Sequence, residues 1–369
     1  MDVRQDQKLM HTLRRWTPWL LLGVVTLGAS LRLWGINYGL PYLYHPDEPL
    51  NVRVIQGIVK TGDLNPHFFT YPTLFYYLSA LAYLPYYLIG RLLGAFHTLA
   101  DIPAPVQHTL GTGVIALPST WLLGRGLSAV CGIASIVVVY LVGRDLTGRR
   151  AVGLLAALSM AVSPVNVANS RLITPDALLM LTIVFAFWRA VWIYQRGRGR
   201  DYAAAGVACG LVAATKYNGV LIASAIVVAH LLRSGWAGWR DRRLYLTFAL
   251  TGAVLLMANP YMILDYQGWL GGMHYNASHY TGGHPGMEGD TLRYYLTYLW
   301  QTEAPAGALG VLGILDFLGV DDRLNIGAEL YFNGAAHSSS LVSDKGLYYL
   351  PGGTVPTTTK ARSEEHTSE

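Results

Sequence analysis

Residues 126–167 read GLSAVCGIASIVVVYLVG RDLTGRR AVGLLAALSMAVSPVNV, two apolar runs joined by a short turn that carries three arginines. Each run is about as long as an α-helix must be to cross the hydrocarbon core of a bilayer. Similar runs recur along the chain, and we expect eight membrane spans, at residues 18–34, 126–143, 151–167, 177–194, 202–215, 219–232, 244–264 and 304–319. The sequence therefore predicts an all-α polytopic membrane protein.

The composition supports a membrane protein and excludes other classes. Of the 369 residues, 52% are hydrophobic and only 13% are charged, against roughly 25% charged in an ordinary soluble domain. The net charge of +5 does not indicate a nucleic-acid partner, because no basic stripe with interleaved aromatic residues lies outside the membrane turns. Cys131 and Cys209 both lie in apolar runs, so we interpret them as packing residues and not as a disulfide or a metal pair.

The basic residues predict how the chain is oriented. They concentrate before the first span and in three short turns: Arg4, Lys8, Arg14, Arg15; Arg144, Arg149, Arg150; Arg196, Arg198, Arg200; Arg233, Arg240, Arg242, Arg243. Lys and Arg favour cytoplasmic turns, so we expect a cytoplasmic N-terminus and a first span that is an uncleaved signal anchor. If successive spans alternate between the two sides of the membrane, residues 202–232 must form two spans with a break at 216–219. Residues 73–94 and 108–124 are either further spans or interfacial helices in the first outer loop.

The acidic residues predict which face carries the chemistry. Nine of them fall in the expected outer segments: Asp47, Glu48, Asp63, Asp101, Asp176, Asp265, Glu288, Asp290 and Glu303. The cytoplasmic turns contain no G-x-x-x-x-G-K-[ST] phosphate loop. We therefore expect any reaction to take place on the outer face, with a substrate that is delivered on a lipid.

The strongest local motif is YHPDEP at residues 44–49, directly after the first span. Its prolines restrict the backbone, which suits a carboxylate held in a fixed pose near the membrane surface. Adjacent residues point in different directions, so one of Asp47 and Glu48 can act as a general base while the other orients the loop. The alternative is an acidic pair that is simply solvated.

Several strings in order resemble one family: YHPDEP, GRDLTGRR, NSRLITPDALL, LVAATKYNG, and NPYMILDYQGW followed by HYTGGHPG. Together they resemble the GT-C class of membrane glycosyltransferases, in particular the family 39 branch with the protein O-mannosyltransferases and aminoarabinose transferases. The resemblance covers about residues 14–305. It implies a GT-C transmembrane helix bundle, a catalytic Asp47 with Glu48 beside it, a second outer acid at Asp176, and inverting transfer from a polyprenyl-phosphate sugar to a lipid, glycan or protein acceptor.

The transfer also needs a cation for the departing lipid phosphate. Arg171 and Lys216 are the candidates, with Arg53 as a weaker one, and Tyr217 follows Lys216 at the predicted helix break. Alternatively, Lys216 reaches the interface from a span end, and Arg171 pairs with Asp176 across a short turn.

Histidines supply the remaining candidate substrate contacts. His45 belongs to the YHPDEP motif, while His274, His279 and His284 recur every five residues in a Gly-rich outer loop. We expect that loop to cover the substrate, with His279 and His284 in contact with it, in preference to a metal site. We expect no cofactor.

Two other functions are alternatives to a glycosyltransferase. A transporter would need charged or broken helices at the bilayer midplane and an internal repeat, and Arg189 is the only charge well inside a predicted span. A non-catalytic assembly subunit is the other alternative.

We assign residues 1–320 to a truncated transferase module in a bacterial cytoplasmic membrane, leave 321–361 uninterpreted, and expect RSEEHTSE at 362–369 to be translated sequencing adaptor.

Overall fold

The computed structural model describes residues 3–42, 44–98, 101–102, 106–109, 112–115, 118–282, 290 and 292–304. The chain divides into two compact units, residues 1–306 and 307–369, and the described residues all belong to the first. The predicted span at 304–319 therefore lies outside the described residues except for its first position. The same holds for the whole of residues 321–369.

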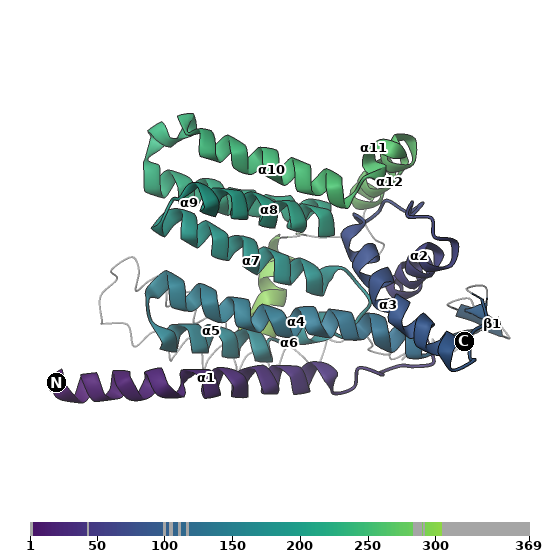
Figure 1. Cartoon of the computed structure of the whole chain (residues 1–369), viewed down its shortest axis with the longest axis horizontal. Helices are drawn as coiled ribbons and strands as arrows, with labels where there is room; N and C mark the ends of the chain where they lie inside the picture. Colours follow the sequence, from purple (N-terminus) through teal and green to yellow (C-terminus); the bar gives the residue numbers. More distant parts are fainter. Residues whose placement is uncertain are drawn as a thin grey trace, which may run out of the picture. The chain divides into compact units, whose positions relative to one another are not determined.

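Helices dominate the described chain, as the apolar runs predict (Figure 1). The N-terminal part contains α1 (Val3–Leu33), α2 (Asp47–Thr61), α3 (Leu74–Leu92) and the antiparallel strands β1 (Val106–Thr109) and β2 (Thr112–Ile115), in which Val106 pairs with Ile115. The remainder contains α4 (Pro118–Thr147), α5 (Arg150–Val162), α6 (Pro164–Asn169), α7 (Asp176–Gln195), α8 (Gly199–Thr215), η2 (Tyr217–Ile222), α9 (Ala223–Ser234), η3 (Trp236–Arg240), α10 (Arg242–Ala258), α11 (Tyr261–Leu264) and α12 (Tyr266–Gly282). A further helix occupies 292–304.

The long helices pack side by side in a bundle. Helix α4 contacts α5 and α7, α7 contacts α8 and α9, and α8 contacts α10, while α1 packs on α4 and α5 (Figure 1). Among the described residues, four segments are long and apolar enough to cross a membrane: Arg15–Leu33, Pro118–Thr147, Asp176–Gln195 and Tyr217–Ser234. The other described helices at predicted spans, α5, α8 and α10, have 13, 17 and 17 residues. The polytopic helical fold is thus confirmed.

Two sequence-based boundaries need correction, and one is confirmed. Residues 108–124 form no single helix, because Val106–Thr109 and Thr112–Ile115 pair as strands β1 and β2, and α4 begins at Pro118, eight residues before the predicted start. The predicted break in 202–232 is confirmed, since α8 ends at Thr215 and Lys216 has an extended backbone. Cys131 and Cys209 are buried and free, as expected.

Arg32 on α1 supplies hydrogen bonds where the chain breaks between α5 and α6. Pro164 has no N–H to donate to the carbonyl of Met160, so the last carbonyls of α5 lack their helical partners. The buried guanidinium of Arg32 supplies donors instead, at 3.0 Å to Met160 O and 3.0 Å to Ala161 O, and also donates to the Asn166 side chain. This contact fixes α1 against the α5–α6 junction.

Small residues let α8 and α10 approach closely. A Cβ on Gly206 would lie 2.6 Å from the carbonyl oxygen of Thr247, and one on Gly210 would lie 2.6 Å from Val254 Cβ. The Thr251 hydroxyl uses this proximity to donate to Gly206 O at 3.1 Å. Gly206 and Gly210, four residues apart on α8, thus form the small-residue contact surface that close packing of membrane helices requires.

We expect Gly206→Ala to lower the melting temperature of the purified protein in detergent, because the added methyl group meets backbone that cannot move independently. Overpacking of this kind costs about 1–3 kcal/mol. Gly252→Ala on α10 is the matched control, since its Cβ would meet nothing within 4 Å. Alanine favours a helix over glycine by up to about 1 kcal/mol, so the control should melt at the same temperature or higher. Equal destabilisation by both variants would contradict close α8–α10 packing.

Candidate functional site

Glu48 of the YHPDEP motif forms a buried ion pair whose partner could not be predicted from the sequence. Glu48, 1% exposed, receives two hydrogen bonds from Arg125 of α4, from Nε to Oε1 at 2.8 Å and from Nη2 to Oε2 at 2.7 Å. The backbone N–H of Ile173 also donates to Oε1, at 3.0 Å. Both carboxylate oxygens of Glu48 are therefore occupied, which makes it a poor proton acceptor and a strong anchor for α2.

Arg125 extends this anchor to the segment that follows α1. Its Nη1 donates to the carbonyls of Ile36 and Tyr38, at 2.9 and 2.8 Å. A sequence signal for Arg125 did exist, because it is a lone charge in the apolar stretch that becomes α4, and such charges are costly unless they are paired. Its partner is 77 residues away along the chain, so the pairing itself could not be read from the sequence.

Asp47 lies beside this anchor with its carboxylate in a different environment. It is the first residue of α2 and is half-buried, and its backbone N–H donates to His45 Nδ1 at 3.2 Å. Its Oδ2 receives one long contact, 3.5 Å from the hydroxyl of Tyr71. Its position at the N-terminal end of α2 places it beside backbone N–H groups that lack helical partners. Asp47 therefore has the capacity to accept a proton that Glu48 lacks.

Lys216 and Asp47 both lie next to the side chain of Tyr71. The Lys216 Nζ lies 5.5 Å from the centroid of that ring and 2.8 Å from Oδ1 of Asp176, the first residue of α7. The two side chains of this ion pair are 24% and 34% exposed, so water or a ligand can reach them. Asp47, Tyr71, Lys216 and Asp176 together form what we call the outer cluster.

Arg171 takes no part in the contacts described for this cluster, and the alternative that paired it with Asp176 is wrong. Asp176 pairs with Lys216 instead of Arg171, whose guanidinium donates to the carbonyl of Leu31 at the end of α1. Arg53 is exposed on α2. Tyr217 is half-buried and lies near Tyr76, whose phenol also neighbours Asp47.

The segment that contains Tyr71 is held against the C-terminal part of the described chain. Asn65 Nδ2 donates to Asp265 Oδ2 at 2.9 Å, Asn276 Nδ2 donates to Thr70 O at 3.1 Å, and Thr73 Oγ1 donates to the side chain of Asn259 at 2.9 Å. The amide donors of Asn65 and Gly268 lower the pKa of the Asp265 carboxyl, so this tie is maintained in the ionised form.

The expected His-containing loop is partly a helix. Residues 266–282 form α12, which places His274 and His279 exposed on a helix, with His279 stacked on Tyr275 at 5.6 Å between ring centroids. His284 lies outside the described residues. Across the described part of the chain, no group of three or more His, Cys, Asp or Glu side chains is arranged to hold a metal ion.

The helical arrangement is that of the GT-C membrane transferases. The oligosaccharyltransferase of Archaeoglobus fulgidus, solved with a tethered acceptor peptide, is similar over 89% of this chain and 37% of its own, with a TM-score of 0.51 and 16% identity. The protein O-mannosyltransferase Pmt1–Pmt2 complex of S. cerevisiae, bound to the sugar donor, is similar over 69% of this chain and 34% of its own, with a TM-score of 0.48 and 19% identity. The chain thus spans about a third of the length of each of these proteins.

A family match agrees with that fold. Residues 118–263 match the family described as dolichyl-phosphate-mannose-protein mannosyltransferase, over about two fifths of the chain. The matched region includes Arg125, Asp176 and Lys216, whereas Asp47 precedes it. No curated protein sequence matches the chain significantly. The resemblance expected from the motifs is confirmed at the level of this class.

We expect Glu48→Gln to destabilise the protein far more than Asp47→Asn. The first change leaves the Arg125 charge buried without its counter-charge, and breaking a buried pair costs about 3–5 kcal/mol. The second change alters a half-buried side chain that has one long contact, so its effect should stay within about 0.5 kcal/mol. Thermal unfolding of both variants in the same detergent measures the difference. Equal melting temperatures would contradict the structural role of Glu48.

Proposed function

We propose that this chain belongs to a membrane glycosyltransferase that moves a sugar from a polyprenyl-phosphate donor to an acceptor on the extracytoplasmic face. The observation that carries the proposal is the outer cluster, in which a carboxylate lies at the Tyr71 hydroxyl and an ammonium group lies near the ring of the same tyrosine. Transfer at an anomeric carbon needs a base for the acceptor and a cation for the leaving phosphate. The GT-C fold and the family match support this activity class.

Asp47 is the base in this proposal. It accepts the proton of the acceptor hydroxyl while the acceptor oxygen forms a bond to the anomeric carbon. The bond between that carbon and the phosphate oxygen breaks on the opposite side, and its electron pair leaves with the polyprenyl phosphate. The configuration at the sugar is inverted. Glu48 takes no direct part, because its oxygens already receive hydrogen bonds from Arg125 and Ile173.

Lys216 is the cation that stabilises the leaving phosphate. An ammonium group has three donors, and one of them is directed to Asp176, which leaves the others for phosphate oxygens. The helix break at Lys216 puts this charge beside apolar chain, where its attraction to a partly desolvated phosphate is stronger than in water. Arg171 is a weaker candidate, because it already donates to Leu31 O.

We expect Asp47→Asn to reduce the initial rate of sugar transfer by about two orders of magnitude or more, since the amide keeps the shape and removes the basicity. The rate is measured in membrane vesicles that carry the chain, with a radiolabelled polyprenyl-phosphate sugar. Asp63→Asn is the matched control. Asp63 is an exposed outer carboxylate that bonds to Asn65 and His67, so its variant should keep the normal rate. Transfer by Asp47→Asn at the wild-type rate would refute the assigned base.

We expect Lys216→Met to weaken binding of the lipid-linked donor by about 10- to 100-fold, because a hydrogen bond to a charged group contributes about 1.5–3 kcal/mol. Donor binding is measured on the purified protein in nanodiscs. Lys60→Met, at the other end of α2 from Asp47, is the control and should bind normally. Asp47→Asn should also bind donor normally, since the base acts on the acceptor. Displacement of the donor by a free sugar nucleotide, or unchanged affinity in Lys216→Met, would contradict the mechanism.

A further inference from the structure

The side chain of Tyr71 contacts both functional charges of the outer cluster. Its hydroxyl lies 3.5 Å from Asp47 Oδ2, and the centroid of its ring lies 5.5 Å from Lys216 Nζ. The carboxylate is therefore at the hydroxyl end of the phenol, and the ammonium group is near the ring. The separation of the two charges depends on where this phenol is held.

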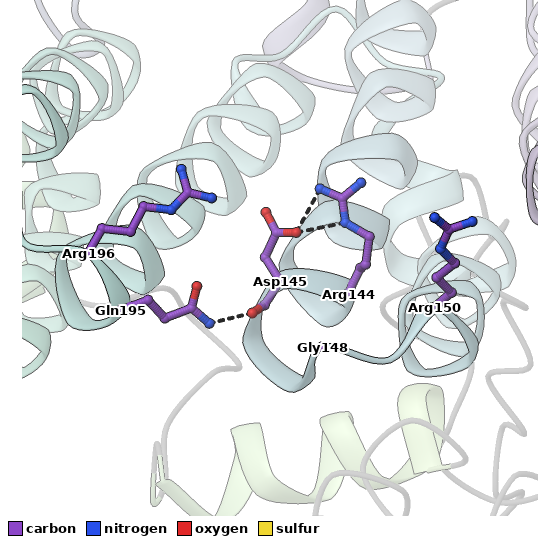
Figure 2. A pocket seen from close by; sticks show the side chains of 6 residues that line it. All are labelled: Arg144, Asp145, Gly148, Arg150, Gln195 and Arg196. Atoms are coloured by element: carbon purple, nitrogen blue, oxygen red, sulfur yellow. Dashed lines mark hydrogen bonds and ion pairs between the residues drawn. The ribbon is translucent and has the colours of Figure 1, made fainter. Parts of the chain in front are cut away.

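Asp47 and Lys216 share this neighbour but do not form an ion pair with each other. Opposite charges pair directly where they can meet, as Figure 2 shows in the last turn of α4, where Arg144 Nη2 lies 2.7 Å from Asp145 Oδ1. Asp47 forms no such ion pair with any described residue, and Lys216 pairs with Asp176. The base and the cation of the proposed reaction are thus both available.

Lys216 has spare capacity for a second carboxylate. A lysine side chain has a flexible four-carbon stem and an ammonium group with three donors. Asp176 uses one of these donors, at 2.8 Å. A second carboxylate would attract the same charge strongly where water is partly excluded. The phenol of Tyr71 is the side chain that contacts both groups and so is placed to prevent this second pairing.

The chain on both sides of Tyr71 is held by hydrogen bonds to later segments. The carbonyl of Thr70 accepts from Asn276 of α12 at 3.1 Å, and the Thr73 hydroxyl donates to the side chain of Asn259 at 2.9 Å. Tyr71 itself is half-buried. A ring on a backbone that is fixed in this way can act as a spacer, because it does not follow the motion of the two charges.

We propose that Tyr71 is a positioning residue whose aromatic ring keeps Lys216 from pairing with Asp47. The inference rests on the proposed function, in which Asp47 is the base and Lys216 binds the leaving phosphate. An ion pair between these two groups would weaken the base and occupy the cation at the same time. The ring carries this role rather than the hydroxyl, because a contact of 3.5 Å restrains the carboxylate only weakly.

Carbodiimide cross-linking of the purified protein shows which carboxylate Lys216 touches, without any need for sugar transfer. The reagent activates a carboxylate, which then forms an amide with an amine in contact with it. The Lys216–Asp176 pair is accessible, with side chains 24% and 34% exposed. In the wild-type protein and in Tyr71→Phe, we expect mass spectrometry to find Lys216 joined to Asp176. In Tyr71→Ala and Tyr71→Ser, the yield of Lys216 joined to Asp47 should rise several-fold.

Transfer rates measured across pH provide the second test. We expect Tyr71→Ala to lose about tenfold or more in rate, and Tyr71→Phe to stay within a few-fold of the wild type. In Tyr71→Ala the acid limb of the pH–rate profile should move to lower pH by about one pH unit, since a nearby ammonium group favours an ionised carboxylate. Adding Lys216→Met should move the limb back. Tyr77→Ala, which removes another half-buried tyrosine, is the control and should leave the limb in place.

Two results would overturn the proposal. One is that Lys216 is joined only to Asp176 in Tyr71→Ala and Tyr71→Ser, as in the wild type. The other is that Tyr71→Phe has the rate and the pH profile of Tyr71→Ala, which would assign the role to the hydroxyl. Failure of the proposed function gives a different result. The cross-links would then change as expected, while Asp47→Asn transferred sugar at the wild-type rate.

Discussion

The buried ion pair between Glu48 and Arg125 is the contact on which the candidate site depends. It joins four segments that are distant in sequence: the start of α2, the first turns of α4, the carbonyls of Ile36 and Tyr38, and the N–H of Ile173. A buried pair need not stabilise a protein relative to an apolar replacement, but it is satisfied in very few geometries. The pair therefore selects one arrangement of these segments.

The fixed orientation of Glu48 also determines the direction in which the Asp47 side chain points. Successive residues of an α-helix are about 100° apart around its axis, since each turn contains about 3.6 residues. Holding Glu48 towards α4 consequently turns Asp47 away from α4 and towards Tyr71. Two acidic residues that look equivalent in the sequence thus differ in what they can do. One is fixed by three donors, and the other is available to a ligand.

The sequence predicted those parts of the structure that depend on local pattern. Apolar runs and arginine turns predicted the helices α4, α5, α7, α8, α9 and α10, and the need to alternate sides placed the break at Lys216 correctly. The predicted spans at 151–167 and 244–264 are shorter in the structure, because the first breaks at Ser163 and the second ends at Ala258. That Asp47 and Glu48 point in different directions was also predicted, but the sequence did not show that Glu48 is the one buried against α4. Local pattern failed within residues 108–124, which were interpreted as a span or an interfacial helix, whereas Val106–Thr109 and Thr112–Ile115 form paired strands.

Pairings between residues far apart in the chain could not be predicted from the sequence. One alternative paired Asp176 with Arg171, five residues away, whereas Asp176 pairs with Lys216, 40 residues away. Tyr71 was not singled out, because nothing local distinguishes it from the other tyrosines of its segment. Its position comes from hydrogen bonds that join residues 65–73 to residues 258–276, which are about 200 positions distant.

Arg32 has a consequence for how the protein is made. It belongs to α1, which is synthesised before its acceptors at Met160, Ala161 and Asn166, because these follow 128 to 134 residues later. At about 5–20 residues per second, the ribosome needs roughly 6–27 seconds to produce them. During that interval Arg32, a permanent positive charge in an apolar segment, has only the Gly28 carbonyl of α1 as a native acceptor, and the charge is expensive to leave in lipid. Nascent α1 must therefore keep this end at the membrane surface, or against another protein, until the α5–α6 junction has emerged.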